Sequence, residues 1–210
     1  GIVLDLRNNP GGVLDQAVDL SRLFIKSGLI VTQRGRTKGE NIEYKAKSAP
    51  YADIPVVVLI NGGSASASEI VAGALQDHKR AVLIGEQTFG KGSVQTVMQL
   101  DQNEGLKLTT AKYYLPSGRT IQAVGVTPDI VVYPGVAPEN ENSFSIKESD
   151  LKRHLQGELD KINAQNLKTE TANEDKKLIT QTMIYQDIQL KTAIDVLKAW
   201  NVIGTFNPSK

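Results

Sequence analysis

The sequence predicts an α/β fold, and three observations support that prediction. Strand-like and helix-like runs alternate through residues 1–135, and glycine-containing loops separate them. Most of the 18 glycines fall in this part of the chain, as expected for short, tight loops. Residues 55–60 form a continuous apolar run, which is typical of a strand covered on both faces. Alternation of this kind favours a layered α/β architecture.

The first elements are a strand, a loop and a helix. Residues 2–6 (Ile-Val-Leu-Asp-Leu) have the composition of a buried strand, and the loop Asn-Asn-Pro-Gly-Gly follows at 8–12. Apolar side chains then recur at helical spacing from Val13 to Phe24. Residues 29–33 are strand-like, and residues 35–43 predict a polar hairpin or loop.

The middle of the chain continues the same alternation. The apolar strand at 55–60 leads into a helix whose apolar positions begin at Ile70 and which ends near residue 78. A further short strand is expected at 81–84. Residues 93–100 and 106–115 have the composition of a β-pair.

The chain turns polar after its glycine-rich part, so we predict a core at 1–135 and a linker with a helical extension at 136–210. Helices are expected around 148–163 and 174–198. The second carries an apolar stripe, which must pack against the body of the same chain or against a second copy.

Composition excludes several classes of function. A chain with 40% apolar and 22% charged residues is ordinary for a globular protein. A formal charge of +1 gives no reason to expect nucleic acid or an anionic membrane as partner. Zero cysteines rule out disulfides and thiolate metal sites. Because Asp5, Glu69 and Glu86 lack metal-ligand spacing, neither a metal nor a cofactor is predicted.

Ser66 is a candidate nucleophile. It lies in Asn-Gly-Gly-Ser-Ala-Ser-Ala-Ser-Glu at 61–69, where a buried strand gives way to a helix. There the N–H of Ala67, with the helix dipole behind it, could stabilise an oxyanion. The same pattern also matches a capping box that only satisfies helix N–H groups. Ser64 and Ser68 are competing candidates that the local pattern does not exclude.

The loop at 8–12 also ends a strand and opens a helix, so its N–H groups could bind an anion. An oxyanion hole needs two donors about 3 Å from the developing charge. Gly12 and Ala67 could supply them if the two loops meet at one edge of the sheet. The alternative is a tight turn that only glycine can make. A nucleotide phosphate site is disfavoured, because neither of the usual glycine-rich phosphate motifs is present.

Lys91 is a candidate general base, in the run Thr-Phe-Gly-Lys-Gly-Ser-Val-Gln at 88–95. A lysine in this role must be neutral, so its usual pKa of about 10.4 has to fall to about 7, which desolvation can achieve. Phe89 and Val94 are apolar neighbours compatible with that. Gln95 lies four residues on and could hold the amine by a hydrogen bond. An exposed lysine in a glycine turn is the alternative.

Other polar residues offer weaker candidates. His78 suits a helix C-terminus, and His154 lies among charged residues, so a histidine base is disfavoured. Asp5 and Arg7 are expected to form hydrogen bonds beside the first strand. Glu86 could orient a neighbour of the lysine.

Four motifs, in order, resemble those of the carboxy-terminal processing proteases, the tail-specific serine peptidases with a Ser/Lys dyad. They are Asp-Leu-Arg-Asn-Asn-Pro-Gly-Gly at 5–12, Ser-Ala-Ser-Ala-Ser-Glu at 64–69, Gly-Glu-Gln-Thr-Phe-Gly-Lys-Gly at 85–92 and Gly-Val-Thr-Pro-Asp at 125–129. The resemblance implies a crotonase-like ββα core. It also implies specific roles: nucleophile Ser66, general base Lys91, Gln95 beside the lysine, and oxyanion donors Gly12 and Ala67.

The resemblance further implies an endopeptidase that cleaves proteins with exposed apolar C-termini through an acyl-enzyme. Its expected location is the bacterial cell envelope, periplasmic or exported. Members usually carry an N-terminal segment and a PDZ domain before the strand that begins here, so we expect a fragment. Relatives use helical extensions to oligomerise, which predicts a homo-oligomer through residues 148–198; an activating adaptor protein is a further expected partner.

Two alternatives remain open at this level. A protease-like module could bind peptides or partner proteins without cutting them. An acyl-CoA hydratase of similar fold would want carboxylates beside the oxyanion loops rather than a serine and a lysine, so this alternative is disfavoured.

Overall fold

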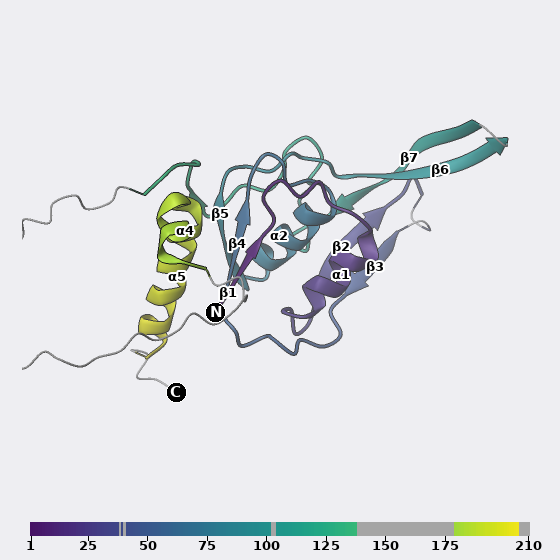
Figure 1. The fold of residues 1–210 in the computed structure, drawn as a ribbon. Coiled ribbons are helices and arrows are strands. Elements are labelled where there is room, and N and C mark those ends of the chain that lie inside the picture. The colour runs from purple at the N-terminus through teal and green to yellow at the C-terminus, as the bar shows by residue number, and fades with distance from the viewer. Residues whose placement is uncertain (38, 40, 102–103, 138–178, 206–210) are drawn as a thin grey trace, which may run out of the picture.

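The computed structural model describes residues 1–137, except 38, 40, 102 and 103, and residues 179–205 (Figure 1). Its first sheet is parallel, with strand order β1-β4-β5-β8. These strands are β1 (Ile2–Asp5), β4 (Val56–Ile60), β5 (Ala81–Gly85) and β8 (Ile130–Val131). The second sheet is antiparallel, with order β3-β2-β7-β6. It contains β2 (Leu29–Arg34), β3 (Ile42–Lys45), β6 (Ser93–Asp101) and β7 (Glu104–Tyr114).

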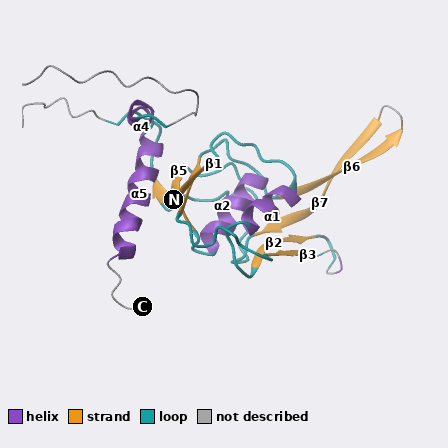
Figure 2. Ribbon diagram, turned by 60° about the horizontal axis from the view of Figure 1, so that its bottom comes forward, coloured by secondary structure: helices purple, strands orange, loops and turns teal. Residues whose placement is uncertain are grey.

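Helices α1 (Leu14–Arg22) and α2 (Ala67–Asp77) pack against each other and lie between the two sheets (Figures 1 and 2). Strand β4 is the centre of this arrangement, since all five of its side chains are buried. Val56, Val58 and Ile60 join the main core with both helices. The prediction of a strand covered on both faces is therefore confirmed.

The opposite face of the parallel sheet is covered by the C-terminal helix α5 (Ile188–Thr205). Val57 and Leu59 of β4 form a second apolar cluster with Ala193, and Leu190 and Leu197 pack around it. The apolar stripe predicted for this region thus packs, in the described residues, against the body of the same chain.

The helix predicted at 174–198 differs from the structure in its continuity. Helix α4 (Gln181–Gln186) and α5 are separated at Asp187, whose backbone is extended. The break has a clear cause, because Asp187 Oδ1 accepts the N–H of Leu190 at 3.0 Å and so caps α5. The helix predicted at 148–163 lies outside the described residues.

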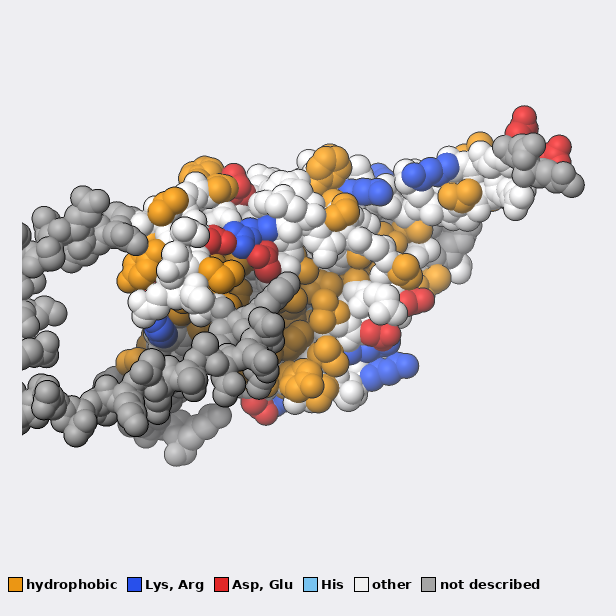
Figure 3. Space-filling view, viewed as in Figure 1, with side chains coloured by type: hydrophobic (Ala, Val, Ile, Leu, Met, Phe, Trp, Pro, Cys, Tyr) orange, Lys and Arg blue, Asp and Glu red, His pale blue; other side chains and the backbone are white. Residues whose placement is uncertain are grey.

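Strands β6 and β7 continue beyond the body of the protein as a two-stranded arm (Figures 1 and 3). The predicted β-pair is therefore confirmed. Two features were not anticipated: the short parallel strand β8 and the two register shifts within the arm. In the part of the chain that the structure describes, no helix has the length and apolar character that a membrane span needs.

Candidate active site

Ser66 occupies the sharp turn between the parallel strand β4 and helix α2. Its backbone angles are φ 57° and ψ −114°, a region that L-residues rarely adopt. An ordinary N-cap residue has extended backbone angles with negative φ. Such strain costs on the order of 1–3 kcal/mol and tends to be kept at functional sites. The capping pattern is present at Ser66, but capping alone does not account for its backbone conformation.

The two competing serines are committed to structural hydrogen bonds. The fully buried Ser64 donates through Oγ to the Leu6 carbonyl at 2.7 Å. Ser68, 4% exposed, donates through Oγ to the Asn9 carbonyl at 3.0 Å. Ser66 is half-buried, and of the three serines it is the one whose hydroxyl donates to no main-chain carbonyl of the described residues.

Glu69 connects the serine turn to the lysine loop. Its side chain is fully buried, and its carboxylate accepts four hydrogen bonds. Oε2 accepts from the backbone N–H of Ser66 at 2.8 Å and from that of Lys91 at 2.9 Å. Oε1 accepts from the Thr88 hydroxyl at 2.5 Å and from the N–H of Gly90 at 2.7 Å. The backbones of Ser66 and Lys91 are thus held side by side by one oxygen atom.

Lys91 is half-buried in this loop, and within the described residues its ammonium forms no ion pair with a carboxylate. Of the two apolar neighbours suggested by the sequence, Val94 packs against the core, whereas Phe89 is 70% exposed. Gln95 lies on β6 just after a register shift, with an exposed side chain. The predicted hydrogen bond between Gln95 and the lysine amine is not formed in this structure.

The loop before α1 lies directly against the serine turn. A Cβ added at Gly11 would sit 2.5 Å from the Ala65 carbonyl oxygen and 2.8 Å from the Ala67 nitrogen. With a φ of 92°, only glycine fits this close approach without strain. The condition stated for the two oxyanion donors, that the two loops lie side by side, is therefore met.

Gly12 and Ala67, the expected oxyanion donors, line one cavity of about 180 Å³. The N–H of Gly11 already donates to Asn9 Oδ1 at 2.9 Å. Across the described ranges, by contrast, the N–H groups of Gly12 and Ala67 donate to no other residue. Apolar side chains form much of the cavity wall, among them Leu6, Val13, Ala17, Leu20 and Val71.

Sequence reasoning missed the part played by Glu69, which it placed only in a capping box. The other weak candidates have structural roles. His78 ends α2 and its Nε2 lies 2.6 Å from the Leu29 carbonyl oxygen. Arg7 and Asp5 do pair, at 2.7 Å, although the Asp5 side chain is 48% exposed. No cluster of metal-ligating residues occurs in the ranges that the structure describes.

Comparison with known proteins places the chain among peptidases. The model of Peptidase family S41 matches residues 1–132. A carboxy-terminal-processing protease of Bartonella bacilliformis is 54% identical over 160 residues, which is 75% of this chain and 37% of that protein. A probable CtpA-like serine protease of Staphylococcus epidermidis is 36% identical over 211 residues, covering 98% of this chain and 42% of that protein.

The solved structure of a photosystem II D1 C-terminal processing protease is also similar. It aligns with a TM-score of 0.59 and 41% identity over 65% of this chain and 35% of that one. The chain spans less than half the length of each of these relatives. The family match covers more than half of the chain and includes all four motifs, and we conclude that the protein belongs to peptidase family S41.

Proposed function

We propose that this chain carries the catalytic core of a serine endopeptidase that processes proteins near their C-termini, with Ser66 and Lys91 as its dyad. One observation supports the proposal above the others. The strained backbone of Ser66 is held beside the backbone of Lys91 by the single Oε2 atom of Glu69. We further propose that residues 1–135 form this core and residues 136–210 a linker and helical extension.

In the proposed mechanism the Ser66 hydroxyl oxygen attacks the scissile carbonyl carbon while the neutral Lys91 amine takes its proton. The N–H groups of Gly12 and Ala67 bind the oxyanion of the tetrahedral intermediate. The lysine then returns the proton to the leaving amine, which departs and leaves an ester on Ser66. A water molecule, deprotonated by the Lys91 amine, then attacks the ester, and the new carboxyl terminus leaves as Ser66 takes the proton back. The role proposed for Gln95 is to orient the lysine amine once substrate is bound.

The cavity lined by Gly12 and Ala67 is suited to bind an apolar substrate side chain next to the scissile bond. Its volume of about 180 Å³ is close to the roughly 150 Å³ of an apolar cavity that accepts benzene. We therefore propose substrates with exposed apolar C-terminal tails. Location in the bacterial cell envelope, a homo-oligomer through residues 148–198 and an activating adaptor remain predictions.

The alternative is a protease-like module that holds peptides without cutting them. The two functions are separated by incubating the chain with a peptide that ends in an apolar tail and identifying the products by mass spectrometry. A peptidase produces fragments, and Ser66→Ala and Lys91→Ala each abolish them. Lys79→Ala, which removes a lysine at the far end of α2, is the matched control and keeps activity. Peptide binding without cleavage by the unmodified chain would favour the module.

A further inference from the structure

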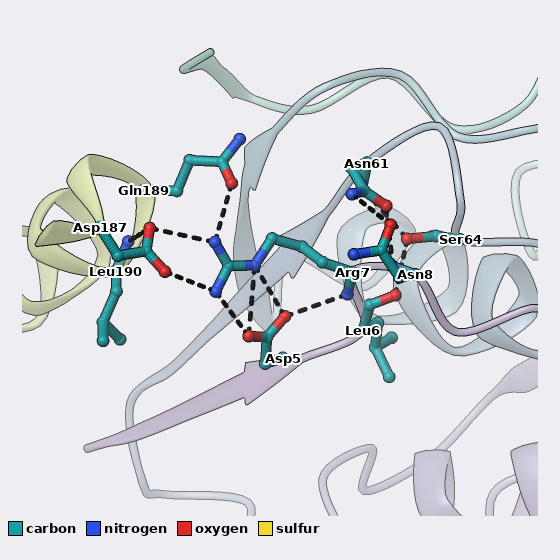
Figure 4. Close-up of polar contacts among 9 residues, drawn as sticks. All are labelled: Asp5, Leu6, Arg7, Asn8, Asn61, Ser64, Asp187, Gln189 and Leu190. Carbon is teal, nitrogen blue, oxygen red and sulfur yellow. Dashed lines mark hydrogen bonds and ion pairs between the residues drawn. The ribbon is translucent and has the colours of Figure 1, made fainter. Parts of the chain in front are cut away.

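Arg7 lies just after β1, at the start of the loop that carries Gly12. Two sides of its guanidinium are held by other side chains (Figure 4). Asp5 accepts from Nε at 3.0 Å and from Nη2 at 2.7 Å. On the opposite side, Asp187 accepts from Nη1 at 3.0 Å and pairs with Nη2 at 2.7 Å, although it lies 180 residues later in the chain.

A second group from the C-terminal helices completes this arrangement. Gln189 is 1% exposed, and its Oε1 accepts from Arg7 Nη1 at 2.9 Å. Its amide donates to the Val132 carbonyl at 2.7 Å, so it is fixed against the segment after β8. The start of α5 therefore presents two acceptors to one guanidinium, and such charge-assisted bonds are the stronger ones in proteins.

The pKa shifts of Arg7 and Asp187 both favour the charged forms that make this ion pair. The hydrogen bonds that Arg7 donates to Asp5 raise the pKa of the guanidinium; burial opposes this rise, and the bond donated to Asp187 adds to it. Burial alone would raise the pKa of Asp187, but its hydrogen bonds with Arg7 and with the N–H of Leu190 outweigh burial and lower it.

Residues 6–9, which flank Arg7, also form hydrogen bonds with the turn that carries Ser66, and Figure 4 shows some of them. Several hydrogen bonds join the two loops. Among them, Ser64 Oγ donates to the Leu6 carbonyl at 2.7 Å, the Asn8 N–H donates to Asn61 Oδ1 at 2.9 Å, and the Ala65 N–H donates to the Asn9 carbonyl at 3.0 Å. A displacement of Arg7 would therefore be transmitted to both loops that carry the proposed oxyanion donors.

We propose that Asp187 and Gln189 are positioning residues for the active site: they hold the Arg7 guanidinium, and Arg7 holds residues 6–12 against the Ser66 turn. They touch no reacting group and act only through Arg7. The catalytic part of this inference rests on the proposed peptidase function. The contact itself makes the C-terminal helix α5 part of the active-site scaffold, beyond its role of covering the sheet.

The test uses Asp187→Ser, because serine caps a helix about as well as aspartate but is too short to bridge two guanidinium nitrogens. Asp195→Ser is the matched control, since Asp195 pairs with Lys191 on the same helix, away from Arg7. We expect Asp187→Ser to lower kcat about tenfold or more with KM within about twofold, because small misplacements of catalytic groups are costly. The kcat of Asp187→Asn, which keeps one acceptor oxygen, should lie between that of Asp187→Ser and that of the wild type.

A second measurement does not depend on catalysis. Amide hydrogen exchange at residues 6–12 and 61–68 should become about tenfold faster in Asp187→Ser, while β4 stays protected. If Asp187→Ser matches Asp195→Ser in both measurements, or if exchange rises equally in β4, the inference is wrong. If the unmodified chain cleaves no peptide, the peptidase proposal fails, and the exchange result alone decides whether α5 positions this loop.

Discussion

Replacing Glu69 with glutamine tests the most heavily bonded side chain in the site. The change keeps the shape of the side chain but turns one acceptor oxygen into a donor NH₂ group. The structure directs four donors at the two carboxylate oxygens, two at each. Whichever way the amide is turned, two of these donors lose their acceptor and face an N–H group.

The magnitude follows from that count. A buried donor left without its partner costs about 1–3 kcal/mol, so two of them cost about 2–6 kcal/mol of unfolding free energy. Because Glu69 is fully buried, solvent water cannot replace the missing acceptor. Small domains have only about 5–15 kcal/mol in total, so the loss should be large and easily measured.

The assay is urea unfolding at 25 °C of the wild type, Glu69→Gln and Glu86→Gln. Glu86 is half-buried, and in the described part of the chain its carboxylate accepts no hydrogen bond, so its variant should stay within about 0.5 kcal/mol of the wild type. Labelling of Ser66 by a fluorophosphonate should also slow in Glu69→Gln, because either orientation of the amide removes acceptor bonds that hold the loop of Lys91 at the Ser66 turn. A Glu69→Gln protein with wild-type stability and wild-type labelling would refute this description of the site.

Three further predictions concern the turn, the glycine loop and the C-terminal contact. Ser66→Gly should be about 0.5–2 kcal/mol more stable than Ser66→Ala in urea unfolding, because glycine adopts the turn without strain; equal stability would argue that the turn is relaxed. In Gly11→Ala the unfolding free energy should fall by at least about 2 kcal/mol, since the added Cβ would clash with the Ala65 carbonyl oxygen. In Gly12→Ala, where the added Cβ has open space, the unfolding free energy should stay close to that of the wild type. The pKa of Asp187 is lowered in the folded protein, so its stabilising effect over Asp187→Ser should be complete above its ordinary pKa of 3.8 and shrink as pH falls through the lowered value. An unfolding difference that grew on acidification from pH 7 to pH 3 would contradict that sign.

The sequence predicted the parts of the fold that local pattern determines. The run at 55–60 is apolar at every position, and β4 is indeed buried on both faces. Each of the glycine loops at 8–12 and 61–69 follows a predicted strand, and in the structure Gly11 lies against Ala65 and Ala67. Strand β8 has only two residues and takes its place by pairing with β5, so no periodicity could reveal it.

The contacts that organise the site depend on tertiary structure. Glu69 matches a local capping pattern, and nothing in that pattern shows that Gly90 and Lys91 will also direct their N–H groups at it. The pairing of Arg7 with Asp187 joins the two ends of the chain, and only the packing of α5 on the sheet brings them together. The break between α4 and α5 has the same origin, since an uninterrupted apolar stripe gave no sign of it.

The proposed mechanism requires Lys91 to remove the proton from Ser66. The most direct measurement is the rate of phosphonylation at Ser66, followed by mass spectrometry from pH 5 to pH 10, in the wild type and in Lys91→Ala. A positioned general base contributes about 10²–10⁴-fold. We therefore expect the wild-type rate to rise with pH and the Lys91→Ala rate to be lower by about that factor. Equal rates in the two proteins, or an adduct on a serine other than Ser66, would contradict the account.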